Sequence, residues 1–162
     1  MPKRTCQTAA WIVVLALLSG LPASCAKSQP EKTYKNIPES DWLKRANDTD
    51  WGTREVAYEA LANLDRMDIV TRALDAEPRE HRLSIAAMIV FYGKDSRARA
   101  AGITALGEAI HGKAEFHNEF WILATHADEA KWLVGRMRNA IDSSEYDRDK
   151  WEMLLRAMGD EP

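Results

Sequence analysis

The chain has four histidines, the side chains best suited to metal binding or proton transfer near neutral pH: His81, His111, His117 and His126. None belongs to a His-Glu-x-x-His array, and His111 and His117 are separated by Gly112 and do not share one face of a helix. A metal site would require folding to assemble His117, His126 and either Glu115 or Asp128. The spacing instead favours surface or capping histidines, and the sequence predicts neither a metal nor a cofactor.

Patterns typical of nucleophilic catalysis are also missing from the sequence. It contains no Gly-x-Ser-x-Gly segment and no glycine-rich phosphate loop, and its eight glycines are scattered. Glu115 and Glu119 lie one helical turn apart, but exposed carboxylates at this spacing are common and need burial to act as acid and base. We therefore predict that the protein has no catalytic residues and is not an enzyme.

Tryptophan is the more unusual feature, with five residues beyond position 25: Trp42, Trp51, Trp121, Trp132 and Trp151. Most tryptophans pack in cores, but one left partly exposed beside an arginine is typical of the energetic centre of a protein interface. Trp51 with Arg54 and Trp132 with Arg136 meet this local condition. We predict a partner-binding surface in the tract that contains Trp121, Lys131, Trp132, Arg136 and Arg138.

The N-terminus has the organisation of an export signal. Lys3 and Arg4 precede an apolar run from Trp11 to Ala23, interrupted only by Ser19, Gly20 and Pro22. A run of about thirteen residues is too short to cross a hydrocarbon core of about 30 Å as a helix. We predict a signal peptide over residues 1–24.

The two cysteines refine this prediction, because Cys6 lies in the segment to be removed and Cys25 directly follows Ala23-Ser24. The segment 21–25, LPASC, resembles a bacterial lipobox, with Pro22 in place of the usual leucine-like residue. The resemblance implies acylation of Cys25, and Ala26 in the next position implies the outer membrane. The alternative is ordinary cleavage, for instance after Ala26, which would leave a soluble periplasmic or secreted protein.

Charge argues against nucleic acid as a partner. The net charge of the whole chain is −3, and it becomes −5 once the two basic residues Lys3 and Arg4 are removed. Binding to phosphates needs a concentrated basic surface, which this sequence lacks. A lipid at Cys25 would be the only predicted contact with the membrane.

Residues 25–39 are polar and contain two prolines, so we predict a disordered tether there and a folded domain over residues 40–162. In the domain, apolar residues recur at spacings of three and four, as on one face of a helix. The expected helices are 41–47, 53–64, a segment capped by Asp65, 78–92 stopped by a left-handed Gly93, 95–110, 128–141 and 143–158 closed by Gly159. A further segment surrounds residues 116–123.

The run 85–92, IAAMIVFY, has no polar residue, and we expect it to form the centre of the core. The following helix carries a stripe of small residues at spacings of three and four, Ala98, Gly102, Ala105 and Ala109, which would let another helix approach closely. These patterns predict an all-α fold.

Three of the expected helices share one residue pattern. In each, an arginine is followed by small or apolar residues three, six and seven positions further along the chain. The arginines are Arg54, Arg82 and Arg99, spaced 28 and then 17 residues apart. Asp50 and Asp95 precede the first and last. Residues 48–112 resemble HEAT repeats, which implies short helical hairpins stacked as a right-handed α-solenoid or a compact helical bundle, and a scaffold that binds proteins.

Together these features predict a non-catalytic adaptor lipoprotein of the cell envelope that holds a protein partner on a HEAT-like helical surface. An envelope immunity or inhibitor protein that neutralises a toxic enzyme is the alternative, and an exported helical enzyme is the third interpretation.

Overall fold

The computed structural model describes residues 30–110, 115–144 and 146–160. The chain divides into two compact units, Met1–Pro30 and Glu31–Pro162, and the second contains nearly all of the described residues. It is helical apart from one short hairpin, which confirms the all-α prediction. The predicted signal peptide, 1–24, and the predicted lipidation site Cys25 lie outside the described residues.

The elements follow one another with short connections. Strands β1 (Thr33–Tyr34) and β2 (Ile37–Pro38) come first, and the helical elements are α1 (Glu39–Arg45), α2 (Trp51–Asn63), α3 (Met67–Ala76), α4 (Arg79–Tyr92), α5 (Ser96–Ala109), η1 (Asn118–Trp121), α6 (Ile122–Thr125), α7 (Ala127–Ala130), η2 (Lys131–Leu133), α8 (Val134–Ser143) and α9 (Arg148–Ala157). The helix expected over 128–141 is thus divided between α7, η2 and α8.

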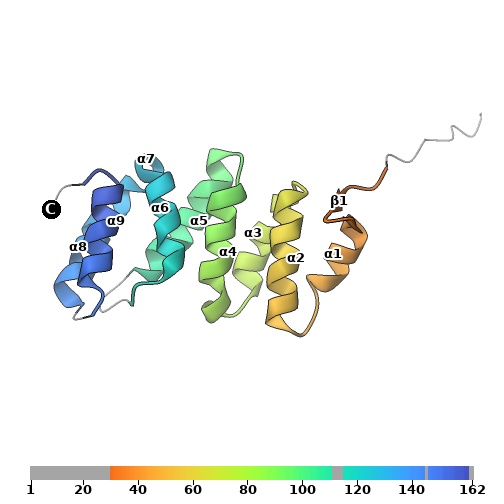
Figure 1. Cartoon of the computed structure of the whole chain (residues 1–162), viewed down its shortest axis with the longest axis horizontal. Helices are drawn as coiled ribbons and strands as arrows, with labels where there is room; N and C mark the ends of the chain where they lie inside the picture. The colour runs from red at the N-terminus through yellow and green to blue at the C-terminus, as the bar shows by residue number, and fades with distance from the viewer. Residues whose placement is uncertain (1–29, 111–114, 145, 161–162) are drawn as a thin grey trace, which may run out of the picture. The chain divides into compact units, whose positions relative to one another are not determined.

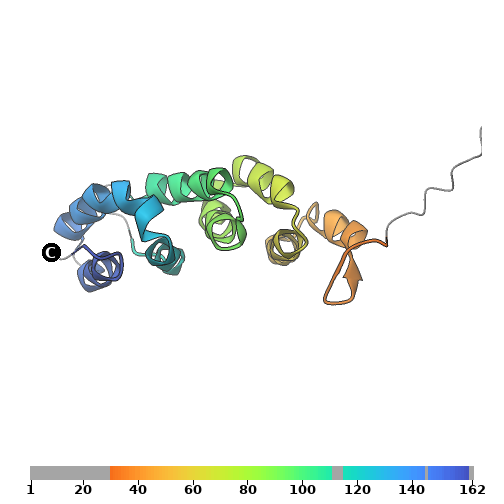
Figure 2. The same cartoon turned by 90° about the horizontal axis from the view of Figure 1, so that it is seen from above.

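The helices of the second unit form two layers. Helices α2, α4, α6 and α9 lie side by side in one layer, each in contact with the next (Figure 1). In the other layer α5 contacts both α3 and α7, and this layer also contains α1 and α8 (Figure 2). Consecutive helices such as α3 and α4 pack against each other between the layers, so each buries its apolar face on its neighbours.

Asp50 and Asp95, which the sequence places just before two of the expected helices, cap the first turns of α2 and α5. The side chain of Asp50 accepts a hydrogen bond from the Thr53 amide at 2.7 Å, and Asp95 accepts one from the Ala98 amide at the same distance. Each carboxylate satisfies an amide that has no partner within the helix. The pKa of Asp50 is lowered, chiefly by the backbone hydrogen bond from Thr53.

Helix α4 lies at the centre of the core, as expected. Ile85, Ala86, Ile89 and Val90 are completely buried. The close approach of α5 depends on Gly102, because a Cβ there would lie 2.7 Å from the Ala86 carbonyl oxygen. The apolar run is nevertheless not buried on all sides: Phe91, which belongs to it, is 64% exposed.

Two predicted boundary residues act differently from expectation. Gly93 is not left-handed (φ −64°); a glycine is required there because a Cβ would lie 2.4 Å from the Ile89 carbonyl oxygen. Asp65 does not cap α3: it adopts a positive φ of 69°, and its carboxylate accepts a hydrogen bond from Lys94 at 2.8 Å. Gly159, with φ +79°, does terminate α9 as predicted.

The folded part begins earlier than the predicted boundary at residue 40. Within the expected tether, Tyr34 pairs with Ile37 across the antiparallel strands β1 and β2. Lys35 and Asn36 make the turn with positive φ. Tyr34 packs against Trp42, whose indole Nε1 donates a hydrogen bond to the Tyr34 carbonyl at 3.3 Å. The polar composition of this stretch obscured the hairpin, because its two apolar residues meet only after the turn has formed.

Candidate protein-binding surfaces

Trp132 in η2 is a large aromatic side chain left on the surface, 53% exposed. The Arg136 guanidinium, from the first turn of α8, lies 5.5 Å from the centre of its ring. Arg136 Nη1 also donates a hydrogen bond to the Gly107 carbonyl of α5 at 2.7 Å. The arginine is therefore held at the indole face by a second contact, in the arrangement of a cation–π pair.

Gly107 explains why η2 can lie so close to α5. A Cβ at this position would lie 2.3 Å from Leu133 Cδ2 and 3.1 Å from Trp132 Cη2. Leu133 is completely buried, so the backbone of η2 is anchored while the neighbouring Trp132 remains exposed. The contacts of Arg136 with Gly107 and with the Trp132 ring restrict the positions open to this pair, and such restriction reduces the entropy lost on binding.

The structure does not bring all five predicted site residues together. Trp121 is half-buried, and its ring packs edge-on against Phe116, with centroids 5.4 Å apart. Lys131 is exposed next to Trp132. Arg138 is exposed and forms an ion pair with Asp160 at 2.8 Å. Trp132 and Arg136 thus form the centre of the candidate surface.

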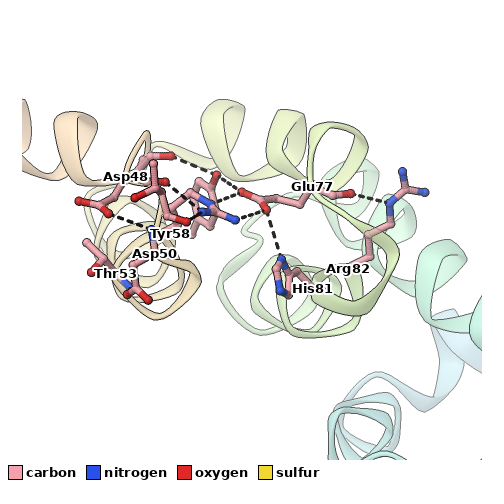
Figure 3. Close-up of polar contacts among 10 residues, drawn as sticks. Asp48, Asp50, Thr53, Tyr58, Glu77, His81 and Arg82 are labelled. Atoms are coloured by element: carbon pink, nitrogen blue, oxygen red, sulfur yellow. Dashed lines mark hydrogen bonds and ion pairs between the residues drawn. The ribbon is translucent and has the colours of Figure 1, made fainter.

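A second group of polar side chains surrounds Glu77, which is only 8% exposed (Figure 3). Arg54 of α2 binds both carboxylate oxygens, through Nε at 2.7 Å and Nη2 at 2.8 Å. The Tyr58 hydroxyl donates a third hydrogen bond at 2.8 Å, and His81 Nδ1 lies 3.4 Å away. We call these four residues the Glu77 cluster.

The electrostatics of the Glu77 cluster favour an ionised carboxylate. The hydrogen bonds from Arg54 lower the pKa of Glu77 to about 2, against the opposing effect of burial. Burial and the adjacent carboxylate raise the pKa of Tyr58 to about 12. Glu77 therefore holds no proton near neutral pH, and Tyr58 keeps its own, so these two groups act as hydrogen-bond acceptor and donor rather than as an acid–base pair.

The cluster joins two turns of the fold. Arg54 Nη1 donates to the carbonyls of Asp48 and Thr49, both at 2.9 Å, while its other nitrogens bind Glu77 in the turn before α4. His81 stacks on Trp51, with ring centroids 3.9 Å apart and planes inclined by 4°. The arrangement fixes α2 against the start of α4.

Arg99 repeats this geometry in α5. Its Nη1 donates to the carbonyls of Gly93 and Lys94, at 3.0 and 3.2 Å, and its Nε binds the Glu129 carboxylate at 2.9 Å. In both helices the arginine lies one turn after the capping aspartate. It binds the carbonyl oxygens of the two residues that directly precede that aspartate. Sequence reasoning aligned Arg54 with Arg99 but missed Glu77, whose only local signal is an acid next to Pro78 at a helix start.

Within the described part of the chain, no three His, Cys, Asp or Glu side chains are grouped closely enough to hold a metal ion. His117 is exposed, and His126 lies 3.9 Å from Glu129. Among the same residues, none of the helices has the length and apolar character needed to cross a membrane.

Comparison with protein-family models, with curated proteins and with solved structures found no match to this chain.

Proposed function

We propose that this protein is a non-catalytic adaptor lipoprotein of the cell envelope, which uses a HEAT-like helical surface to hold a protein partner. The single observation that carries the binding role is Trp132, exposed and yet fixed in place by Arg136 and Gly107. Tryptophan and arginine are the residue types most enriched where interfaces concentrate their energy.

The HEAT-like assignment is supported by the layering of the helices. Arg54 and Arg82 are 28 residues apart and lie in α2 and α4, adjacent helices of the same layer. Each arginine also binds carbonyls in the turn before its helix: Arg82 Nε donates to the Glu77 carbonyl at 3.1 Å. The step of 17 residues to Arg99 crosses from one layer to the other. The interval of 28 residues is therefore the spacing between two neighbouring helices of one layer.

The expected role of Trp132 can be tested by site-specific crosslinking. A photoreactive phenylalanine analogue placed at position 132 of the full-length chain should crosslink a defined envelope protein in cells. Separately, Trp132→Ala should weaken the affinity for that protein by at least about 30-fold, corresponding to about 2 kcal/mol. Affinity is measured with the purified partner by calorimetry.

Tyr146 offers a matched control, because it is 89% exposed and lies outside the tract. The same analogue at position 146 should not capture this partner, and Tyr146→Ala should bind it normally. A folded Trp132→Ala variant with unchanged affinity would refute the site. If the captured partner is an enzyme and loses its activity in the complex, the alternative inhibitor function replaces the adaptor role.

The lipoprotein part of the proposal predicts acylation at Cys25. Cells that express the full-length protein should incorporate an alkyne fatty acid into it, and Cys25→Ala should abolish this label. Cys6→Ala is the matched control and should label normally, since Cys6 belongs to the predicted signal peptide. Equal labelling of the Cys25→Ala variant and the unaltered protein would instead favour a soluble exported protein.

A further inference from the structure

A groove of about 410 Å³ lies on the layer formed by α2, α4, α6 and α9, between α2, α4 and the η1–α6 segment. Its apolar surface comes from Ala87 and Met88 of α4 and Ile122 of α6. Met88 and Ile122 are only partly buried, although both pack against the core. The groove is therefore lined by apolar atoms that remain accessible.

The exposed Phe91 also lines this groove, one helical turn after Ala87 on α4. Its ring packs edge-on against Tyr92, with centroids 4.8 Å apart and planes inclined by 82°. A phenylalanine that is 64% exposed beside an apolar groove offers a contact for an apolar side chain of a partner. This surface was not anticipated from the sequence, where Phe91 was assigned to the core.

The charged side chains that line the groove are all acidic. Glu59 of α2 and Glu119 of η1 line it from opposite sides of α4, and none of its described lining residues is a lysine, arginine or histidine. Glu59 receives one hydrogen bond, from the Tyr34 hydroxyl at 3.5 Å, which leaves most of the acceptor capacity of its carboxylate unused. Lys94, at the end of α4, is already paired with Asp65 at 2.8 Å.

We infer that this groove binds a basic amphipathic segment of another protein, with an apolar side chain against Phe91 and Met88 and flanking lysines or arginines at Glu59 and Glu119. Complementary charge favours such a segment over an acidic one, which would meet two carboxylates without a compensating cation. The inference goes beyond the proposed function, because it concerns a different layer and a surface of opposite charge from the Trp132–Arg136 pair.

Two synthetic fourteen-residue peptides provide the probe, one with leucine and lysine in an amphipathic helical pattern and one with glutamate in place of lysine. Fluorescence anisotropy with the full-length protein should show saturable binding of the lysine peptide and none of the glutamate peptide. The double variant Glu59→Gln/Glu119→Gln and the single variant Phe91→Ala should each weaken binding about 10-fold.

Matched controls separate this site from general attraction of a cationic peptide to an acidic protein. Asp128→Asn/Asp142→Asn removes the same charge from exposed positions of α7 and α8, and Met153→Ala removes an apolar side chain that is 56% exposed on α9. Both should bind as the unaltered protein does, within about twofold, and so should Trp132→Ala, whatever its effect on the other partner.

The inference is overturned if both acid-pair variants weaken binding equally, since the attraction is then non-specific. Binding of the glutamate peptide with similar affinity overturns it as well. A third contrary result is self-association of the protein in light scattering that Phe91→Ala abolishes, because a second copy would then occupy the groove. Circular dichroism first establishes that each variant retains its helical signal.

Discussion

The Ile89→Asp variant should fail to fold at neutral pH. Ile89 is completely buried in α4, the helix that contacts α2, α3, α5 and α6. An aspartate there must either bury a charge without a partner or take up a proton at neutral pH, and it also leaves unfilled volume. We expect a loss of about 5 kcal/mol or more, comparable with the whole stability of a small domain. Circular dichroism and thermal melting measure the result.

Phe91→Asp is the matched control, because it places the same residue two positions further along the same helix, where the side chain is 64% exposed. This variant should keep the helical signal and melt cooperatively, with a change in stability of about 1 kcal/mol or less. A cooperative transition of Ile89→Asp close to that of the unaltered protein would contradict the position of α4 in the core.

Glu77→Gln should destabilise the domain by about 3 kcal/mol at pH 7. The side chains of Arg54 and Glu77 are 15% and 8% exposed, so the substitution leaves a largely buried guanidinium without its counter-charge. Removing one partner of a buried pair costs more than the pair contributes, because the remaining charge stays desolvated. Urea unfolding followed by circular dichroism measures the difference.

The same carboxylate makes stability depend on pH in a defined direction. Its pKa falls from an ordinary 4.5 to about 2 in the folded protein, so the folded state binds the proton less readily than the unfolded state. The contribution of Glu77 is therefore fully present above about pH 5 and is lost as the pH falls toward 2. Across this interval the unaltered protein should lose more stability than Glu77→Gln does, by about 2–3 kcal/mol.

Glu80→Gln is a suitable control, since Glu80 lies exposed in the first turn of α4, close to the cluster in sequence. It should alter stability by less than about 0.5 kcal/mol and retain the pH dependence of the unaltered protein. If Glu77→Gln and the unaltered protein lose stability in parallel between pH 7 and pH 3, the ion pair with Arg54 does not contribute as the geometry indicates.

Local patterns in the sequence were sufficient to predict most of the helices. The spacing of apolar residues depends only on residues within one or two turns, and the structure has helices where this spacing predicts them. Gly102 was likewise recognised as a point of close approach, because small residues at helical spacing permit it whatever the partner.

Features that depend on distant residues could not be predicted in this way. Glu77 is 23 residues from Arg54, and nothing in either local sequence specifies the other as its partner. The exposure of Phe91 follows from where α2 and α6 pack against α4, not from the apolar run that contains it. For the binding tract, the sequence identified Trp132 with Arg136 correctly as neighbours, but Trp121 packs against Phe116 instead.

The layered arrangement has a kinetic consequence. The principal pairings join consecutive helices or neighbours within one layer, so few long loops must close before packing contacts form. Helical proteins in which local pairings predominate fold within about microseconds to milliseconds. In a chain that emerges progressively from a ribosome or a translocation channel, α1 and α2 can pack together as soon as they are released. Each later helix can then pack against the helices that have already folded.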